Sequence, residues 1–135
     1  MAVASAYQNA AKYRQTQVDT ASPTQLVVML YDGAIRFLSL ARQKMGPGDI
    51  EARNTLLLKA QRIITHLISS LDLEKGGDVA VNLQRLYTFM LLQIIEANVY
   101  DRAAPIDEVV GLLRELRESW VEVDLQYKQA ERVVA

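Results

Sequence analysis

The sequence predicts an all-α protein, an antiparallel up-down four-helix bundle with an N-terminal arm or short helix. Three observations support this prediction. Apolar residues recur at helical spacing along most of the 135 residues. Proline and glycine occur at few places, and they divide the chain into segments of similar length. Strand-like alternation of apolar and polar residues between turns is missing throughout.

The first predicted helix covers residues 23–45. Ser22 suits the N-cap, Pro23 suits the first helical position, and Gln25 completes a capping box with Ser22. Gly46, Pro47 and Gly48 end the helix. The apolar stripe expected to face the core consists of Leu26, Leu30, Ala34, Phe37 and Ala41.

The next two predicted helices meet at Gly76 and Gly77. Asp49 is a plausible N-cap for a helix that runs to about Lys75, and Asp78 can cap the next, which runs to about Tyr100. The expected core stripe of the first of these helices is Leu57, Ala60, Ile64, Leu67 and Leu71. That of the second is Leu83, Leu86, Met90, Ile94 and Ala97.

Pro105 opens the last predicted helix. Its expected core stripe is Ile106, Val109, Leu113, Leu116, Trp120 and Tyr127. Four rods of matched length, each roughly 30–38 Å, pack most simply as an antiparallel bundle. We therefore expect one domain over residues 1–135, with a mobile N-terminal arm (1–21) and a bundle (22–128).

The helix that ends near Tyr100 has a second apolar side. At 100° per residue, this side lies opposite Met90, away from the core stripe. It consists of Val81, Thr88, Leu92, Ile95 and Val99, here called the outer ridge, and Leu91 flanks it. An exposed apolar strip of this kind usually marks an interaction surface, so the outer ridge predicts a partner-binding site.

A weaker side ridge lies on the first predicted helix, beyond its core stripe. It consists of Val28, Tyr31, Ile35 and Leu38. Two interpretations remain open here. The ridge binds the same partner, or it packs against the N-terminal arm as part of a wide bundle stripe.

Composition excludes several classes of function. The net charge of −1 gives no general attraction to nucleic acid or anionic lipid, although residues 1–48 carry +3 and residues 49–135 carry −4. The chain has no cysteine, and we expect no metal and no other cofactor. No segment resembles a signal peptide, and no apolar segment is long enough to cross a bilayer. We therefore expect a cytoplasmic protein without stable membrane insertion.

Catalytic groups are also missing, and no enzyme is predicted. The chain has one histidine, His66, no HExxH motif and no phosphate-binding loop before a helix. One alternative is a phosphoryl-relay bundle that uses an exposed His66. However, Leu67 and Ile68 follow it, where that class of protein has a lysine and a small residue.

The stretch TQVDTASPTQLVVMLYDGAIRFLSLA, residues 16–41, resembles the start of the flagellar export chaperone FliS family. The matching positions are Tyr13, Val18, Thr20, Ala21, Ser22, Pro23, Leu26, Met29, Leu30, Tyr31, Asp32 and Gly33. Further matches are AQRIITHLISSLDLEKGGDVAVNLQRLYTFM, ANVYD and EVVGLLRELRESW. The resemblance therefore covers nearly the whole chain in order.

This resemblance implies a cytoplasmic chaperone that binds the C-terminal segment of new flagellin, stops premature polymerisation and delivers flagellin to the flagellar export gate. It also implies an N-terminal lid over the binding surface, with Tyr7, Tyr13 and Val18. The residues expected to bind flagellin are Val81, Thr88, Leu91, Leu92, Ile95, Val99, Val28, Tyr31 and Ile35. Most motif residues, such as Ser22 and Gly33, are interpreted as structural, whereas Asp32 is either a contact or solvated. A homodimer closed through the outer ridge, and a co-chaperone, remain open as further partners.

Overall fold

The computed structural model describes residues 20–46 and 48–134. The expected lid residues Tyr7, Tyr13 and Val18 lie outside the described residues. The described part is all-helical and contains no strand, which confirms the predicted fold class. Its helices are α2 (Pro23–Gln43), α3 (Ile50–Ser69), α4 (Leu73–Tyr100) and α5 (Ala104–Val134).

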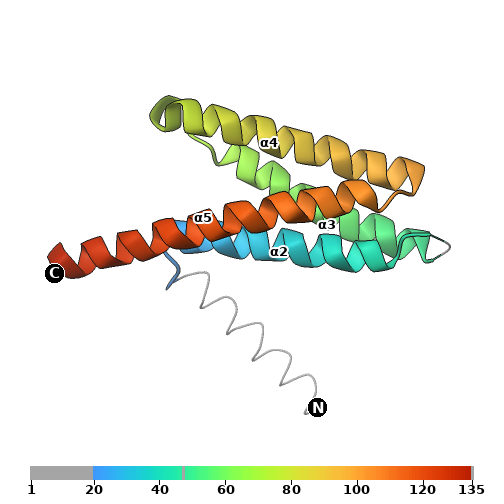
Figure 1. The fold of residues 1–135 in the computed structure, drawn as a ribbon, viewed down its shortest axis with the longest axis horizontal. Helices are drawn as coiled ribbons and strands as arrows, with labels where there is room; N and C mark the ends of the chain where they lie inside the picture. Colours follow the sequence, from blue (N-terminus) through green and yellow to red (C-terminus); the bar gives the residue numbers. More distant parts are fainter. Residues whose placement is uncertain (1–19, 47, 135) are drawn as a thin grey trace, which may run out of the picture.

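The four helices form an antiparallel up-down bundle (Figure 1). α2 packs against α3 and α5, and α4 packs against the same two helices. Consequently α2 and α4 lie diagonally across the bundle, as do α3 and α5. This arrangement gives each helix one face toward the centre and one face toward solvent.

The predicted helix starts at Ser22 and Asp49 are confirmed. The Ser22 side chain accepts a hydrogen bond from the Gln25 backbone N–H, and the Gln25 side chain accepts one from the Ser22 N–H at 2.9 Å. The Asp49 carboxylate accepts from the Ala52 N–H at 3.0 Å. Each cap satisfies backbone donors that have no partner within the helix.

The predicted end of the second helix near Lys75 is wrong, whereas the predicted interruption at Gly77 is present as a kink. α3 already ends at Ser69, and α4 is capped by Asp72, whose carboxylate accepts from the Lys75 N–H at 3.0 Å. Gly77 has φ 54° and ψ −135°, and it makes a kink inside α4. Asp72 supplies an earlier cap than Asp78, and glycine permits the bend at a backbone conformation that other residues avoid.

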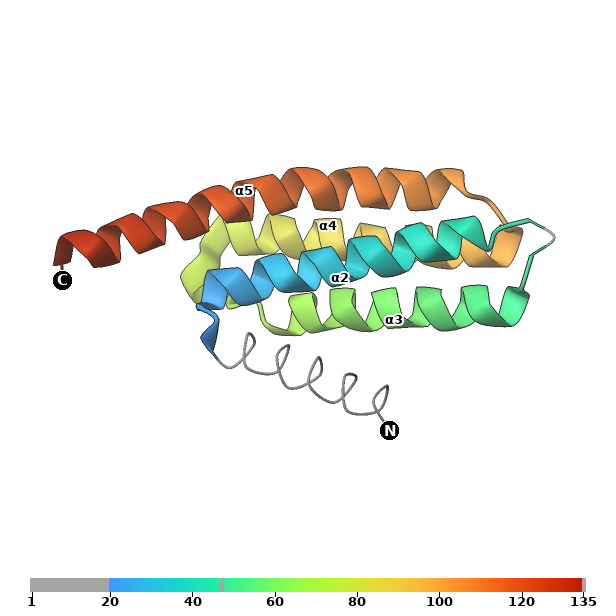
Figure 2. The ribbon, with the colours of Figure 1, turned by 90° about the horizontal axis from the view of Figure 1, so that it is seen from below.

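The last helix is longer than predicted. α5 continues to Val134, and its C-terminal part extends past the ends of the other helices (Figure 2). Tyr127 lies in this extension and is 45% exposed, so its assignment to the core stripe was wrong. Apolar residues continue at helical spacing into this extension, but no other described helix lies there to bury them.

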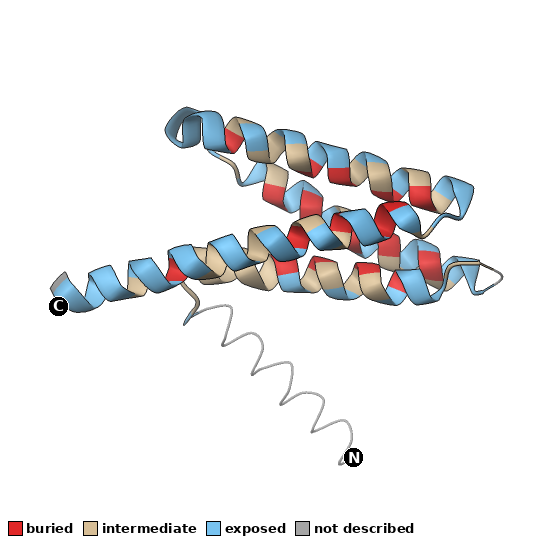
Figure 3. Cartoon of the chain, viewed as in Figure 1, coloured by how far each residue is buried: buried red, intermediate tan, exposed pale blue. Residues whose placement is uncertain are grey.

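The core lies along the inner faces of the four helices (Figure 3). The predicted stripes of α3 and α4 are confirmed for most of their residues, since Leu57, Ile64, Met90 and Ile94 are fully buried. The exceptions are only half-buried: Leu71, which lies beyond the end of α3, and Leu83 and Leu86 of α4. On α2 the buried face differs from the predicted stripe. It consists of Tyr31, Ala34, Leu38 and Ala41, whereas Leu26, Leu30 and Phe37 are half-buried.

Tyr31 and Leu38 were therefore wrongly placed on a side ridge. The Tyr31 and Tyr87 hydroxyls lie 2.5 Å apart, and the Trp120 indole N–H donates to the Tyr31 oxygen at 2.8 Å. Burial raises the pKa of both tyrosines. This network lets two hydroxyl groups enter the core without losing their hydrogen bonds.

The expectation that no segment is long enough to span a bilayer is wrong for one helix. α2 is long and apolar enough to do so by length and composition alone. The core helix of a bundle meets the same criteria, and α2 packs against α3 and α5 here. α2 is strongly apolar because it packs against two neighbouring helices as well as the core.

Candidate functional site

The outer ridge of α4 lies at the surface, on the side opposite the buried Met90. Leu92 is 61% exposed, Ile95 is 47% exposed and Val99 is 67% exposed. Thr88 is also exposed, and its hydroxyl donates to the Gln84 carbonyl at 2.8 Å, while Val81 is half-buried. The ridge therefore presents apolar side chains to solvent, and the hydroxyl of Thr88 beside them already has a hydrogen-bond partner within α4.

Leu91 flanks the ridge and connects it to the interior. It is half-buried and packs against the hydrophobic core, as its position beside the ridge predicts. Leu91 thus lies between the exposed ridge and the core. Any change in the ridge that shifts Leu91 would also disturb the core.

Phe89 belongs to the same surface, although the sequence analysis did not include it among the residues expected to bind flagellin. It is 39% exposed and precedes Leu92 by one helical turn. A shallow pocket of about 330 Å³ lies beside it, lined by Gln84, Arg85, Thr88, Phe89 and Leu92. The spacing of Phe89 and Leu92 was the signal that could have identified it.

Polar side chains border the ridge on the α5 side of α4. Gln93 donates to the Glu108 carboxylate of α5 at 2.9 Å, and Arg102 donates to Glu96 at 3.3 Å. These groups bind one another and leave the apolar strip uncovered by described residues. An apolar strip with a polar border can bind the apolar face of an amphipathic segment.

The predicted contacts on α2 do not join the outer ridge, because α2 is diagonal to α4. Tyr31 is fully buried, so it cannot serve as a surface contact in this structure. Ile35 is half-buried and packs against the core. Val28, the remaining α2 residue expected to bind flagellin, borders a surface pocket.

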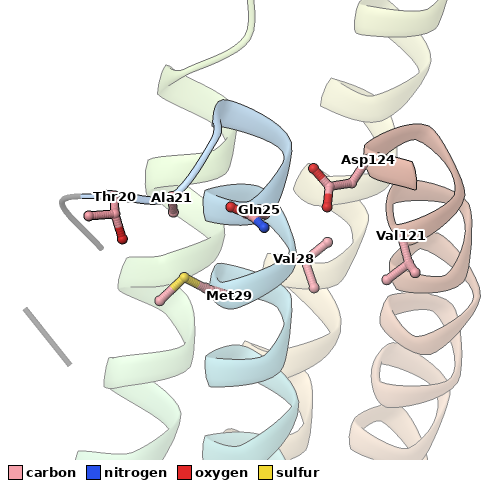
Figure 4. A pocket seen from close by; sticks show the side chains of 7 residues that line it. All are labelled: Thr20, Ala21, Gln25, Val28, Met29, Val121 and Asp124. Carbon is pink, nitrogen blue, oxygen red and sulfur yellow. The ribbon is translucent and has the colours of Figure 1, made fainter. Parts of the chain in front are cut away.

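This second pocket lies between the start of α2 and the C-terminal half of α5 (Figure 4). Its volume is about 360 Å³, and it is lined by Thr20, Ala21, Gln25, Val28, Met29, Val121 and Asp124. The lining mixes apolar side chains with a carboxylate and an amide. It is therefore less suited to a purely apolar ligand group than the outer ridge is.

Asp124 is the charged group of this pocket, and sequence analysis missed it. Its carboxylate accepts hydrogen bonds from Thr24 at 2.5 Å and from Ser22 at 3.0 Å, and Lys128 lies 3.2 Å away. These interactions, that with Thr24 foremost, lower the pKa of Asp124. Asp124 joins the start of α2 to α5, which is a structural task.

The motif residues Asp32 and Gly33 hold α2 against its neighbours. Asp32 forms an ion pair with Arg117 of α5. A Cβ added to Gly33 would lie 3.2 Å from Ile63 of α3. Ser22 and Gly33 are thus structural, as predicted, and Asp32 contacts the protein's own α5.

A polar cluster closes the other end of the bundle. The Asp101 carboxylate accepts from Arg53 at 2.8 Å and from the Gly46 N–H at 2.9 Å. The Arg53 Nε also donates to the Asn98 side chain at 3.2 Å. Asn98 and Asp101 come from the ANVYD stretch, so this motif also serves packing.

His66 is exposed on α3. The described residues contain no group of three or more histidine, cysteine, aspartate or glutamate side chains that could hold a metal ion. Within residues 20–46 and 48–134, His66 forms no ion pair.

Comparison with known proteins points to one family. The family model described as "Flagellar protein FliS" matches residues 4–127. The flagellar secretion chaperone FliS of Salmonella typhimurium is 42% identical over 110 residues, which cover 81% of this chain and 82% of that protein. The FliS chaperone of Vibrio cholerae is 38% identical and that of Bacillus subtilis 32% identical, over 83% and 80% of this chain and 82% and 80% of theirs.

Proposed function

Because this chain belongs to the FliS family of flagellar secretion chaperones, we propose that it protects flagellin by binding the C-terminal segment of that protein. The family assignment makes it a flagellar export chaperone, and its relatives are named as chaperones, not as enzymes. Binding would prevent premature polymerisation of flagellin in the cytoplasm and aid its delivery to the flagellar export gate.

The observation that carries this proposal is the exposed outer ridge of α4. Leu92, Ile95 and Val99 follow one another at helical spacing, and they project from a helix whose other side is fully buried. A rigid bundle loses little conformational freedom when it binds such a segment. The cost of ordering then falls mainly on the flexible partner.

Of the residues expected to bind flagellin, those of α4 remain in the proposal, and Phe89 joins them. On α2, Val28 keeps a separate role at the pocket beside Asp124, and Ile35 is retained only as support from beneath the surface. Tyr31 is removed. The contribution of the lid residues Tyr7, Tyr13 and Val18 stays a prediction.

Two adjacent isoleucines on α4 test the proposal. Ile95→Asp should give a helical protein whose stability changes by less than about 0.5 kcal/mol, because the side chain is exposed. It should lose affinity for a flagellin C-terminal peptide by about tenfold or more, since a charge enters an apolar contact. Thermal melts and titration calorimetry with that peptide measure both quantities.

Ile94→Asp is the matched control, because Ile94 is fully buried. It should lose the cooperative melt, since an unpaired carboxylate enters the core. A stable Ile95→Asp protein that binds the peptide normally would place the binding site elsewhere. A concentration-dependent mass that Ile95→Asp abolishes would instead favour a homodimer through the outer ridge.

A further inference from the structure

A second surface, on α2 and α3, differs in charge from the rest of the molecule. It carries four exposed cations, here called the basic face: Arg36, Lys44, Lys59 and Arg62. Residues 23–69 contain six lysine and arginine residues but only three acidic ones. Residues 73–134, which contain α4 and α5, hold seven basic and eleven acidic residues. The bundle therefore has a basic side and an acidic side.

Two of these cations converge on one aromatic ring. The Arg36 guanidinium carbon lies 5.2 Å from the centre of the Phe37 ring. The Lys59 ammonium of α3 lies 5.5 Å from the same ring. The ring attracts both cations, but it does not neutralise their charge. Two positive groups from neighbouring helices are thus held close to one half-buried aromatic side chain.

The carboxylates of α2 and α3 are used elsewhere. Asp32 binds Arg117 of α5, and Asp49 caps α3. Glu51 lies in the first turn of α3, where a negative charge suits the helix N-terminus. In the described structure, none of these three carboxylates forms an ion pair with the basic face.

Cations on the other interfaces of the bundle do find carboxylates. Arg42 pairs with Asp107 at 2.7 Å, and Arg53 pairs with Asp101 at 2.8 Å. Within residues 20–46 and 48–134, no ion pair includes a member of the basic face. No other described residue therefore neutralises the charge of these side chains, which leaves them available to a negatively charged partner.

We propose that the basic face docks an acidic amphipathic helix of a partner protein other than the segment bound at the outer ridge. Charge complementarity identifies the occupant, because acidic side chains would pair with Arg36 and Lys59. Apolar residues of the same helix would lie against Phe37 and the exposed Leu40. Both partners can bind together, since the outer ridge faces away from the bundle on α4, diagonal to α2.

The chain's own N-terminal residues fit this role poorly by charge. Residues 1–19 contain Lys12, Arg14 and Asp19 and so carry a net charge of +1. Like charges would meet on the basic face. A second copy of the chain, which would dock through its acidic side, is treated as an alternative outcome of the experiment below.

The test uses the full-length protein and two synthetic amphipathic helical peptides. One has leucine on its apolar face and glutamate elsewhere, and the other has lysine in place of glutamate. Fluorescence anisotropy should show binding of the glutamate peptide only, with affinity that falls as salt is added. The double variant Arg36→Glu with Lys59→Glu should weaken this binding by about tenfold or more.

Two controls isolate the surface. The variant Arg114→Glu with Arg132→Glu reverses two exposed α5 cations that have no ion pair in the described structure, and it should bind the peptide normally. The Arg36→Glu, Lys59→Glu protein should keep its melting temperature and its affinity for the flagellin peptide. If the proposal for the basic face fails, the glutamate peptide does not bind as expected. If the proposal for the outer ridge fails, the flagellin peptide does not bind as expected.

Several outcomes would overturn the proposal. Equal affinity for both peptides, or no effect of the Arg36→Glu, Lys59→Glu change, would show that the face does not select negative charge. Binding to phosphatidylglycerol vesicles without binding to the glutamate peptide would indicate a lipid surface instead. A salt-sensitive dimer in sedimentation, lost in the same variant and accompanied by no peptide binding, would identify a second copy.

Discussion

Tyr31 shows why a single side chain can escape sequence analysis. Its apolar neighbours place it at the edge of a helical stripe, and a tyrosine at such an edge is ordinarily half-exposed. The hydroxyls of Tyr31 and Tyr87 bind each other across the bundle diagonal, and Trp120 adds a third group. The partners come from three helices, so no local pattern in the sequence could reveal them.

Replacing Tyr31 with phenylalanine tests the value of this network. The Trp120 N–H and the Tyr87 hydroxyl would lose their shared partner, and we expect a loss of about 1–3 kcal/mol in the free energy of unfolding. Denaturant titration followed by the fluorescence of Trp120 would measure it. Tyr127→Phe, on the exposed part of α5, is the control and should change stability little. Equal losses in the two variants would contradict a special role for the buried hydroxyls.

At the scale of the element, the stripes of α3 and α4 were predictable because each helix places one narrow apolar face inward. The stripe of α2 was not, because apolar residues occur around much of that helix. The contacts of α2 with α5 include the ion pair of Asp32 with Arg117 and the hydrogen bond of Tyr31 with Trp120. These contacts join residues far apart in the sequence, and helical spacing carries no information about them.

The kink in α4 gives a prediction at this scale. Gly77→Ala should lower the free energy of unfolding by about 1–3 kcal/mol, because a Cβ disfavours φ 54° with ψ −135°. Gly111→Ala in α5 should raise it by about 0.5–1 kcal/mol, since a Cβ there meets no atom within 4 Å and alanine favours the helix. Thermal or chemical melts of both variants provide the measurement. A stabilised Gly77→Ala protein would mean that α4 can straighten at no cost.

At the scale of the whole molecule, the ring of helices is closed by α2 and α5. Asp124 forms part of this closure, and its lowered pKa links the closure to pH. A lowered pKa in the folded state means that Asp124 stabilises the bundle above its unfolded pKa. This contribution is lost as the pH falls through the folded value.

We therefore expect the melting temperatures of the wild type and Asp124→Asn to differ at neutral pH and to converge in acid. The convergence should take place between about pH 5 and pH 2. Calorimetric scans across this range measure it, with Glu115→Gln, at an exposed position of α5, as the control. A constant difference between wild type and Asp124→Asn down to the lowest pH would show that the charge of Asp124 is not responsible.

The contact between α2 and α5 also has a consequence for how the chain folds as it is made. Arg42 pairs with Asp107, Asp32 with Arg117, and Thr24 with Asp124. The order of the α5 residues along the chain is the order in which they leave the ribosome. The α2 residues of these three contacts are therefore made well before their α5 partners. Until α5 has been made, Tyr31 lacks its hydrogen-bond partner Trp120, and the contacts among α2, α3 and α4 must hold an open bundle together.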